Sequence, residues 1–136
     1  MTLNQLFGSL SLEDRERILA EGKPQLATKG TVLMRLGELA DSFVILTGGE
    51  VRVSTGESGH RQFLAELRAP TIIGETAIFA GLKRTATVTA STDIKMVVLD
   101  RTAIDRLLNA SPQLRTWLAK LAMERAEQTV MTLSKQ

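Results

Sequence analysis

Hydrophobic residues change their spacing twice along the chain. Between Pro24 and Leu99 short apolar runs are separated by glycine-containing turns, and Val51 and Val53 alternate with polar neighbours, the period-two pattern of a half-buried strand. Many short strands at regular spacing favour a β-sandwich or a jelly-roll barrel. Long helical stretches do not alternate with these strands, so a doubly wound parallel sheet is not expected.

The residues before this β region have the pattern of helices. Ser11 followed by Asp14 resembles a capping box, with Asp in place of the usual Glu or Gln. Gly22 is a candidate C-cap, so the pattern predicts a short amphipathic helix over Ser11–Glu21. An additional turn is expected over Leu3–Phe7.

The last third of the chain also has helical spacing. Asp100 can cap a helix in which Ile104 and Leu107 share a face. Ser111 followed by Pro112 begins a second helix, because proline at the first helical position loses no hydrogen bond. This helix is expected to run to roughly residue 135. Its apolar positions, which include Trp117, are expected to pack in the core or against a partner: Leu114, Trp117, Leu118 and Leu121.

Together these patterns predict one α+β domain over residues 1–136. It consists of a short N-terminal helix, a β jelly-roll barrel with one inserted short helix, and two C-terminal helices. The N-terminal helices are assigned to residues 1–22, the barrel to residues 23–99 and the C-terminal helices to residues 100–136.

Composition narrows the class of protein. Seventeen basic and 15 acidic residues give a net charge of +2, which is too small to argue for nucleic acid. One histidine and no cysteine make a metal centre improbable, and no phosphate-binding loop of the P-loop type occurs, so catalysis is disfavoured. No apolar run approaches the roughly 20 residues of a membrane span, and the N-terminus lacks the pattern of a secretory signal. A soluble cytoplasmic protein is expected.

The segment of residues 74–86 departs from the strand pattern. Glu75–Ala80 has the length of one or two helical turns and is closed by Gly81. A short helix inserted there presents free N–H groups to an anion, and Gly74 lets a ligand oxygen approach the backbone. Arg84 begins the following strand, and its planar guanidinium matches two phosphate oxygens. Glu75 would repel a phosphate, so a sugar hydroxyl is the expected partner of its carboxylate.

This segment resembles the phosphate-binding cassette of cyclic nucleotide-binding domains, which occur in catabolite-activator regulators, cyclic-nucleotide-dependent kinases and nucleotide-gated channels. The pair Gly74-Glu75 and the run Arg84-Thr85-Ala86 stand at a spacing that the family uses, with Glu75 and Arg84 nine positions apart. The resemblance continues along nearly the whole chain, through residues that match the barrel glycines, strands and closing helices of the family: Gly37-Glu38, Phe43–Leu46, Gly48–Val51 and Leu107–Pro112.

The resemblance implies a role for each residue of the cassette. Arg84 is expected to pair with the cyclic phosphate, and Glu75 to accept a hydrogen bond from the ribose 2′-hydroxyl. Thr85 stands where a hydroxyl helps to accommodate guanine, and Arg125 stands on the last helix where some relatives cap the base. Backbone groups that line the phosphate pocket are expected near Gly74, Thr76, Ala77 and Ala86.

Each assignment has a simpler alternative in the residues themselves. Arg84 can be a surface ion-pair residue, and Glu75 a carboxylate favoured by a helix N-terminus. Thr85 can be a strand residue chosen for its β-propensity. Arg125 can be an exposed residue of a charged helix.

The resemblance therefore implies a non-enzymatic sensor of cAMP, with cGMP kept open by Thr85, and with no metal. Binding in the barrel is expected to favour docking of the C-terminal helix, and so to control an effector protein or an attached effector domain such as a channel. The chain is expected neither to bind DNA directly, since no helix-turn-helix follows the last helix, nor to insert into a membrane. The alternative is a degenerate domain that no longer binds a nucleotide and serves as an assembly module.

Overall fold

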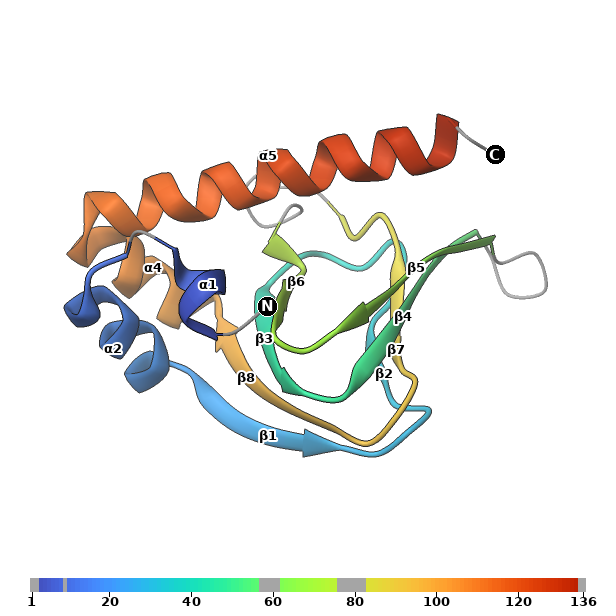
Figure 1. Ribbon diagram of the computed structural model, residues 1–136, viewed down its shortest axis with the longest axis horizontal. Helices are drawn as coiled ribbons and strands as arrows, with labels where there is room; N and C mark the ends of the chain where they lie inside the picture. The colour runs from blue at the N-terminus through green and yellow to red at the C-terminus, as the bar shows by residue number, and fades with distance from the viewer. Residues whose placement is uncertain (1–2, 9, 57–61, 76–82, 135–136) are drawn as a thin grey trace.

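Two antiparallel sheets of four strands each form a roll in the computed structural model, which describes residues 3–8, 10–56, 62–75 and 83–134 (Figure 1). The first sheet has the strand order β1-β8-β3-β6, and consists of β1 (Lys23–Ala27), β8 (Ile94–Asp100), β3 (Ser42–Gly48) and β6 (Thr71–Ile73). The second has the order β2-β7-β4-β5, and consists of β2 (Val32–Met34), β7 (Thr87–Ala90), β4 (Glu50–Thr55) and β5 (Gln62–Arg68). This architecture confirms the predicted fold class.

The helices that the structure describes lie outside the roll. They are α1 (Leu3–Phe7), α2 (Leu12–Glu21), α4 (Arg101–Ala110) and α5 (Pro112–Ser134). In Figure 1, α1, α2 and α4 gather at one end of the roll, and α5 extends from them along one side. The helix α4 packs against α2, α5 and β8, while α5 also contacts β5. Among the described helices, none has both the length and the apolar character needed to cross a membrane.

The helix caps follow the sequence pattern with one exception. Ser11 Oγ accepts a hydrogen bond from the backbone N–H of Asp14 at 3.1 Å, so Ser11 is the N-cap of α2 as predicted. Asp100 Oδ1 accepts from the backbone N–H of Ala103 at 2.9 Å and caps α4. The Asp14 carboxylate, however, does not complete a capping box, because its oxygens accept from Arg17 and Ser111 instead.

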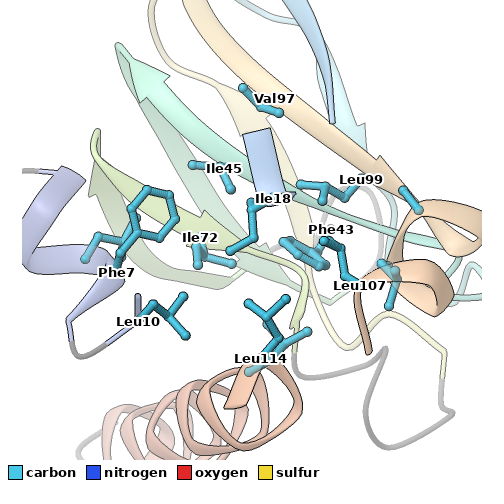
Figure 2. Packing of buried hydrophobic residues seen from close by; sticks show 14 residues of the cluster. Phe7, Leu10, Ile18, Phe43, Ile45, Ile72, Val97, Leu99, Leu107 and Leu114 are labelled. Atoms are coloured by element: carbon cyan, nitrogen blue, oxygen red, sulfur yellow. The ribbon is translucent and has the colours of Figure 1, made fainter. Parts of the chain in front are cut away.

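Within the described ranges, the buried apolar side chains form two clusters. One lies between the first sheet and the helices, where Phe43 and Ile45 of β3 face Ile18 of α2 (Figure 2). The other fills the roll, where Val44 and Leu46 of β3 point to the opposite side. Because β3 is buried on both faces, its sequence is a continuous apolar run rather than an alternating one.

Candidate functional site

The main chain of Arg84 is held by the turn that follows β2. The backbone N–H of Arg84 donates to the carbonyl of Glu38 at 2.7 Å, and the N–H of Gly37 donates to the carbonyl of Arg84 at 2.8 Å. The neighbouring residue Lys83 forms an isolated antiparallel bridge with Leu39. The prediction that Arg84 begins the next strand is therefore wrong. Its backbone groups are used by this turn, and the strand β7 starts at Thr87.

The side chain of Arg84 points into the protein. The residue is only 6% exposed, and its Nη1 donates to the carbonyl oxygen of Gly74 at 2.8 Å. Its Nη2 donates to the carbonyl oxygen of Ser42 and lies 3.5 Å from Ser42 Oγ. Two backbone carbonyls from β3 and from the end of β6 therefore fix the plane of the guanidinium. Arg84 is not a surface ion-pair residue.

The charge of Arg84 is not balanced by a contacting carboxylate in the part of the chain that the structure describes. Among the described residues, no ion pair within 4.0 Å includes this guanidinium. Burial lowers the pKa of Arg84, and the more distant carboxylates of Asp41, Glu38 and Glu75 offset part of that effect. A buried guanidinium held by neutral carbonyls is a favourable place for an anion, because the anion would replace the lost hydration of the charge.

Gly74 makes room for this arrangement. Its φ angle is +91°, a conformation that side chains rarely adopt. A Cβ atom at this position would lie 2.5 Å from Met34 Cε and 2.7 Å from Arg84 Nη1. Glycine is therefore favoured by the backbone turn, and a side chain here would displace the ends of the Met34 and Arg84 side chains.

Glu75 follows directly and is also buried. Its exposed fraction is 2%, and its backbone is already helical after the turn at Gly74. Its carboxylate is close enough to Arg84 to attract the guanidinium, although less strongly than Asp41 and Glu38 do. The site thus joins a buried cation and a buried carboxylate on two segments that the fold brings together.

A comparison with known protein families decides what kind of domain this is. The family model of the cyclic nucleotide-binding domain matches residues 24–111, which include the cassette and all of the roll except Lys23. The chain belongs to this family. Domains of the family are typically regulatory rather than catalytic, and some relatives that match this chain are enzymes by name, an acetyltransferase and a cGMP-dependent protein kinase.

Individual relatives of this cyclic nucleotide-binding domain support the assignment. The chain is 32% identical over 123 residues to a cyclic nucleotide-gated potassium channel of Rhizobium etli, which covers 90% of this chain and 32% of the channel. It is 33% identical over 104 residues to a cAMP-dependent protein kinase regulatory subunit of Yarrowia lipolytica, covering 76% of this chain and 27% of that protein. The chain therefore spans about a third or less of the length of these relatives.

A solved structure shows the same fold. The crystal structure of a cyclic nucleotide-binding domain from Methylobacillus flagellatus superposes with a TM-score of 0.78 at 28% identity, covering 96% of this chain and 77% of that one. The family membership and the fold are thus supported independently by sequence and by structure.

Of the other predicted site residues, the structure describes Thr85 and Ala86 but not Thr76 or Ala77. Thr85 is exposed, and its carbonyl oxygen accepts a hydrogen bond from Thr55 Oγ1 at 3.4 Å. Ala86 is half-buried just before β7. Thr76 and Ala77 lie outside the described residues, as does the rest of the predicted short helix up to Gly81. Arg125 belongs to α5, and its side chain is not among those that the structure describes.

Sequence reasoning missed two residues that shape the site. Met34 packs against Gly74 from β2, and Ser42 holds Arg84 from the first position of β3. Neither residue has a pattern that distinguishes it from an ordinary strand residue, so only the folded structure reveals its position. The prediction for Trp117 is confirmed, because its ring packs against Phe7 with centroids 5.9 Å apart.

Proposed function

We propose that this domain binds a cyclic purine nucleotide, with cAMP as the first candidate, and that Arg84 pairs with its cyclic phosphate. The burial of the Arg84 charge, which has no ion pair within 4.0 Å among the described residues, carries this proposal. A guanidinium has five N–H donors. Among the described residues the Nε–H and one Nη1–H have no acceptor, so they remain available to a phosphate.

Glu75 is proposed to accept a hydrogen bond from the ribose 2′-hydroxyl. A carboxylate repels phosphate but accepts strongly from a hydroxyl, and the Glu75 residue is only 2% exposed and lies next to Gly74 in the cassette. The backbone around Gly74, Thr76, Ala77 and Ala86 is proposed to line the phosphate pocket.

The base is the least determined part of the ligand. The relative in Yarrowia lipolytica is a cAMP-dependent regulatory subunit, which supports cAMP. The exposed Thr85 keeps cGMP as the competing ligand, because its hydroxyl is available for a guanine base. Arg125 of α5 is proposed to cover the base, since α5 contacts β5 of the roll.

Helix α5 is proposed to transmit nucleotide binding to an effector. Nucleotide in the roll would stabilise the docked position of this helix, and the helix would act on a partner or on an attached effector domain. The potassium channel relative, of which this domain covers 32%, supports an attached effector. A cytoplasmic location is proposed with this function.

Calorimetric titration of the purified domain with cAMP, cGMP and 5′-AMP tests the proposal. We expect one site, tighter binding of cAMP than of cGMP, and little heat with 5′-AMP, whose open phosphate lacks the cyclic geometry. Tighter binding of cGMP than of cAMP would change the proposed base from adenine to guanine and leave the rest of the proposal intact. Absence of heat with all three nucleotides would refute the proposed function.

A further inference from the structure

A buried polar contact joins the N-terminal and C-terminal parts of the domain. The hydroxyl of Ser111 donates to Asp14 Oδ2 at 3.0 Å across 97 positions of sequence. Asp14 is 4% exposed and Ser111 is 3% exposed. A charged group hidden this well gains from each hydrogen bond it accepts, so the contact contributes strongly to the relative placement of the two segments.

Both partners have a further polar neighbour. Arg17 Nη1 donates to Asp14 Oδ1 at 3.0 Å and thereby balances the carboxylate charge. Ser111 Oγ also lies 3.1 Å from Gln113 Oε1, a second acceptor. A hydroxyl has one hydrogen, so Asp14 Oδ2 and Gln113 Oε1 compete for it, and the charged carboxylate is the stronger acceptor.

Ser111 occupies the pivot of α5. It is the one residue between α4, which ends at Ala110, and α5, which begins at Pro112, and its backbone is extended with φ −149° and ψ 120°. Proline has no N–H and keeps the preceding residue out of the helical conformation. A change in the direction of α5 that leaves both helices intact must therefore occur at Ser111.

The other contacts around this pivot are apolar. Ile18 of α2, Leu107 of α4 and Leu114 of α5 belong to one buried cluster (Figure 2). Apolar contacts are non-directional and can be exchanged for similar ones when a helix shifts. The hydrogen bond from Ser111 to Asp14 is directional, and it ties the pivot to α2.

We propose that the Asp14–Ser111 hydrogen bond is a latch that couples the docking of α5 to the position of α2. This inference rests on the proposed function, because it adds a second element to the response that the nucleotide produces. With the latch closed, α5 is held in its docked direction, and nucleotide binding is favoured. With the latch open, α5 docks less often, so the apparent affinity falls in proportion to the docked fraction.

Trp117 makes the latch measurable. It is the only tryptophan of the sequence, and it lies on α5 shortly after the pivot with its ring against Phe7. Acrylamide quenching of its fluorescence without nucleotide reports how firmly α5 is docked. Ser111→Ala and Asp14→Ala are expected to increase quenching, whereas Asp14→Asn keeps an acceptor for Ser111 and is expected to remain close to the wild type.

The Kd for cAMP distinguishes a latch from a contact that only stabilises the fold, because only a latch changes the affinity for the nucleotide. Ser111→Ala and Asp14→Ala are expected to raise the Kd by about tenfold each, and the double variant by no more than either alone, because all three break one hydrogen bond. Glu13→Ala is the matched control. Glu13 also pairs with Arg17, at 2.7 Å, but it is exposed and does not contact Ser111.

The outcomes are distinguishable. If folded Ser111→Ala retains the wild-type Kd and the wild-type quenching, the latch is refuted. If the wild-type domain binds no nucleotide, the proposed function fails, but quenching of Trp117 in the variants still decides whether the contact holds α5. Should Asp14→Ala not fold, the comparison of Ser111→Ala with Glu13→Ala decides the question, because Ser111→Ala removes a single oxygen atom.

Discussion

Arg84 keeps a positive charge inside the protein, and its substitution is the most direct test of the site. Hydrogen bonds to charged groups contribute about 1.5–3 kcal/mol each, and about 1.4 kcal/mol corresponds to a factor of ten in affinity. Arg84→Ala is therefore expected to raise the Kd for cAMP at least tenfold in a calorimetric titration. Arg52→Ala is the control, because the Arg52 side chain is 61% exposed on the outside of the roll. Equal affinities of the two variants would contradict the assignment.

Alanine at position 74 has two possible costs: the unfavourable backbone conformation and the contact of its Cβ with neighbouring side chains. Comparison with Gly30 separates the two. Gly30 has a φ angle of +92°, almost the same as Gly74, but a Cβ atom there would meet nothing within 4 Å. Both alanine variants should lose about 1–2 kcal/mol of stability from the backbone conformation. Gly74→Ala should lose more in urea denaturation, because its Cβ would meet Met34 and Arg84, and only this variant should weaken cAMP binding. Identical losses would show that the close approach does not matter.

At the same scale, the residues of the site differ in how far they could be predicted. Gly74, Glu75 and Arg84 stand in a recognisable order along the chain, so their proximity could be expected from the resemblance to a family. Ser42 and Asp14 could not be assigned in this way. Ser42 acts on Arg84 through its backbone carbonyl, which carries no sequence signal, and the partner of Asp14 is 97 positions away.

Among the elements, β1 and the start of β7 differ from the sequence pattern, and each has its own physical cause. The strand β1 lies at the edge of its sheet, contains Pro24 and is exposed at most positions, so it lacks the alternation that marks a half-buried strand. The strand β7 starts three residues after Arg84 because the backbone of Arg84 pairs with a turn. Caps were more predictable, since a cap depends on residues within one helical turn.

The cap of α4 gives a prediction at the scale of an element. Asp100 accepts from the N–H of Ala103 at 2.9 Å, whereas its ion pair with Lys23 is exposed and 3.8 Å long. Asp100→Ala is therefore expected to cost about 1 kcal/mol, nearly all of it from the lost cap. Thermal denaturation measures this loss. Asp105→Ala removes an exposed carboxylate from the same helix and should change the stability little. A loss of similar size in both variants would show that helix charge, not capping, is responsible.

For the whole molecule, the two core clusters suggest how a signal could leave the roll. The strand β3 contributes to both clusters, so a side chain that shifts inside the roll has neighbours that pack against α2 and α4 on the other face. A ligand can move α5 only by the difference in its affinity for the docked and undocked states. Moving from mostly undocked to mostly docked requires about 5.5 kcal/mol. A few charged hydrogen bonds from Arg84 and Glu75, with contacts to the base, have that magnitude.

Linkage between binding and folding provides the last prediction, because it involves the whole domain. A ligand that binds only the native state at 100 times its Kd stabilises that state by about 2.7 kcal/mol. For a domain of this length, that corresponds to a rise in Tm of roughly 10 °C. We expect cAMP to produce this rise in the wild type, and to produce little in Arg84→Ala at the same concentration, even if the variant melts at a different temperature on its own. A rise in Arg84→Ala as large as in the wild type would mean that the nucleotide binds elsewhere on the molecule, and that the buried guanidinium serves only the fold.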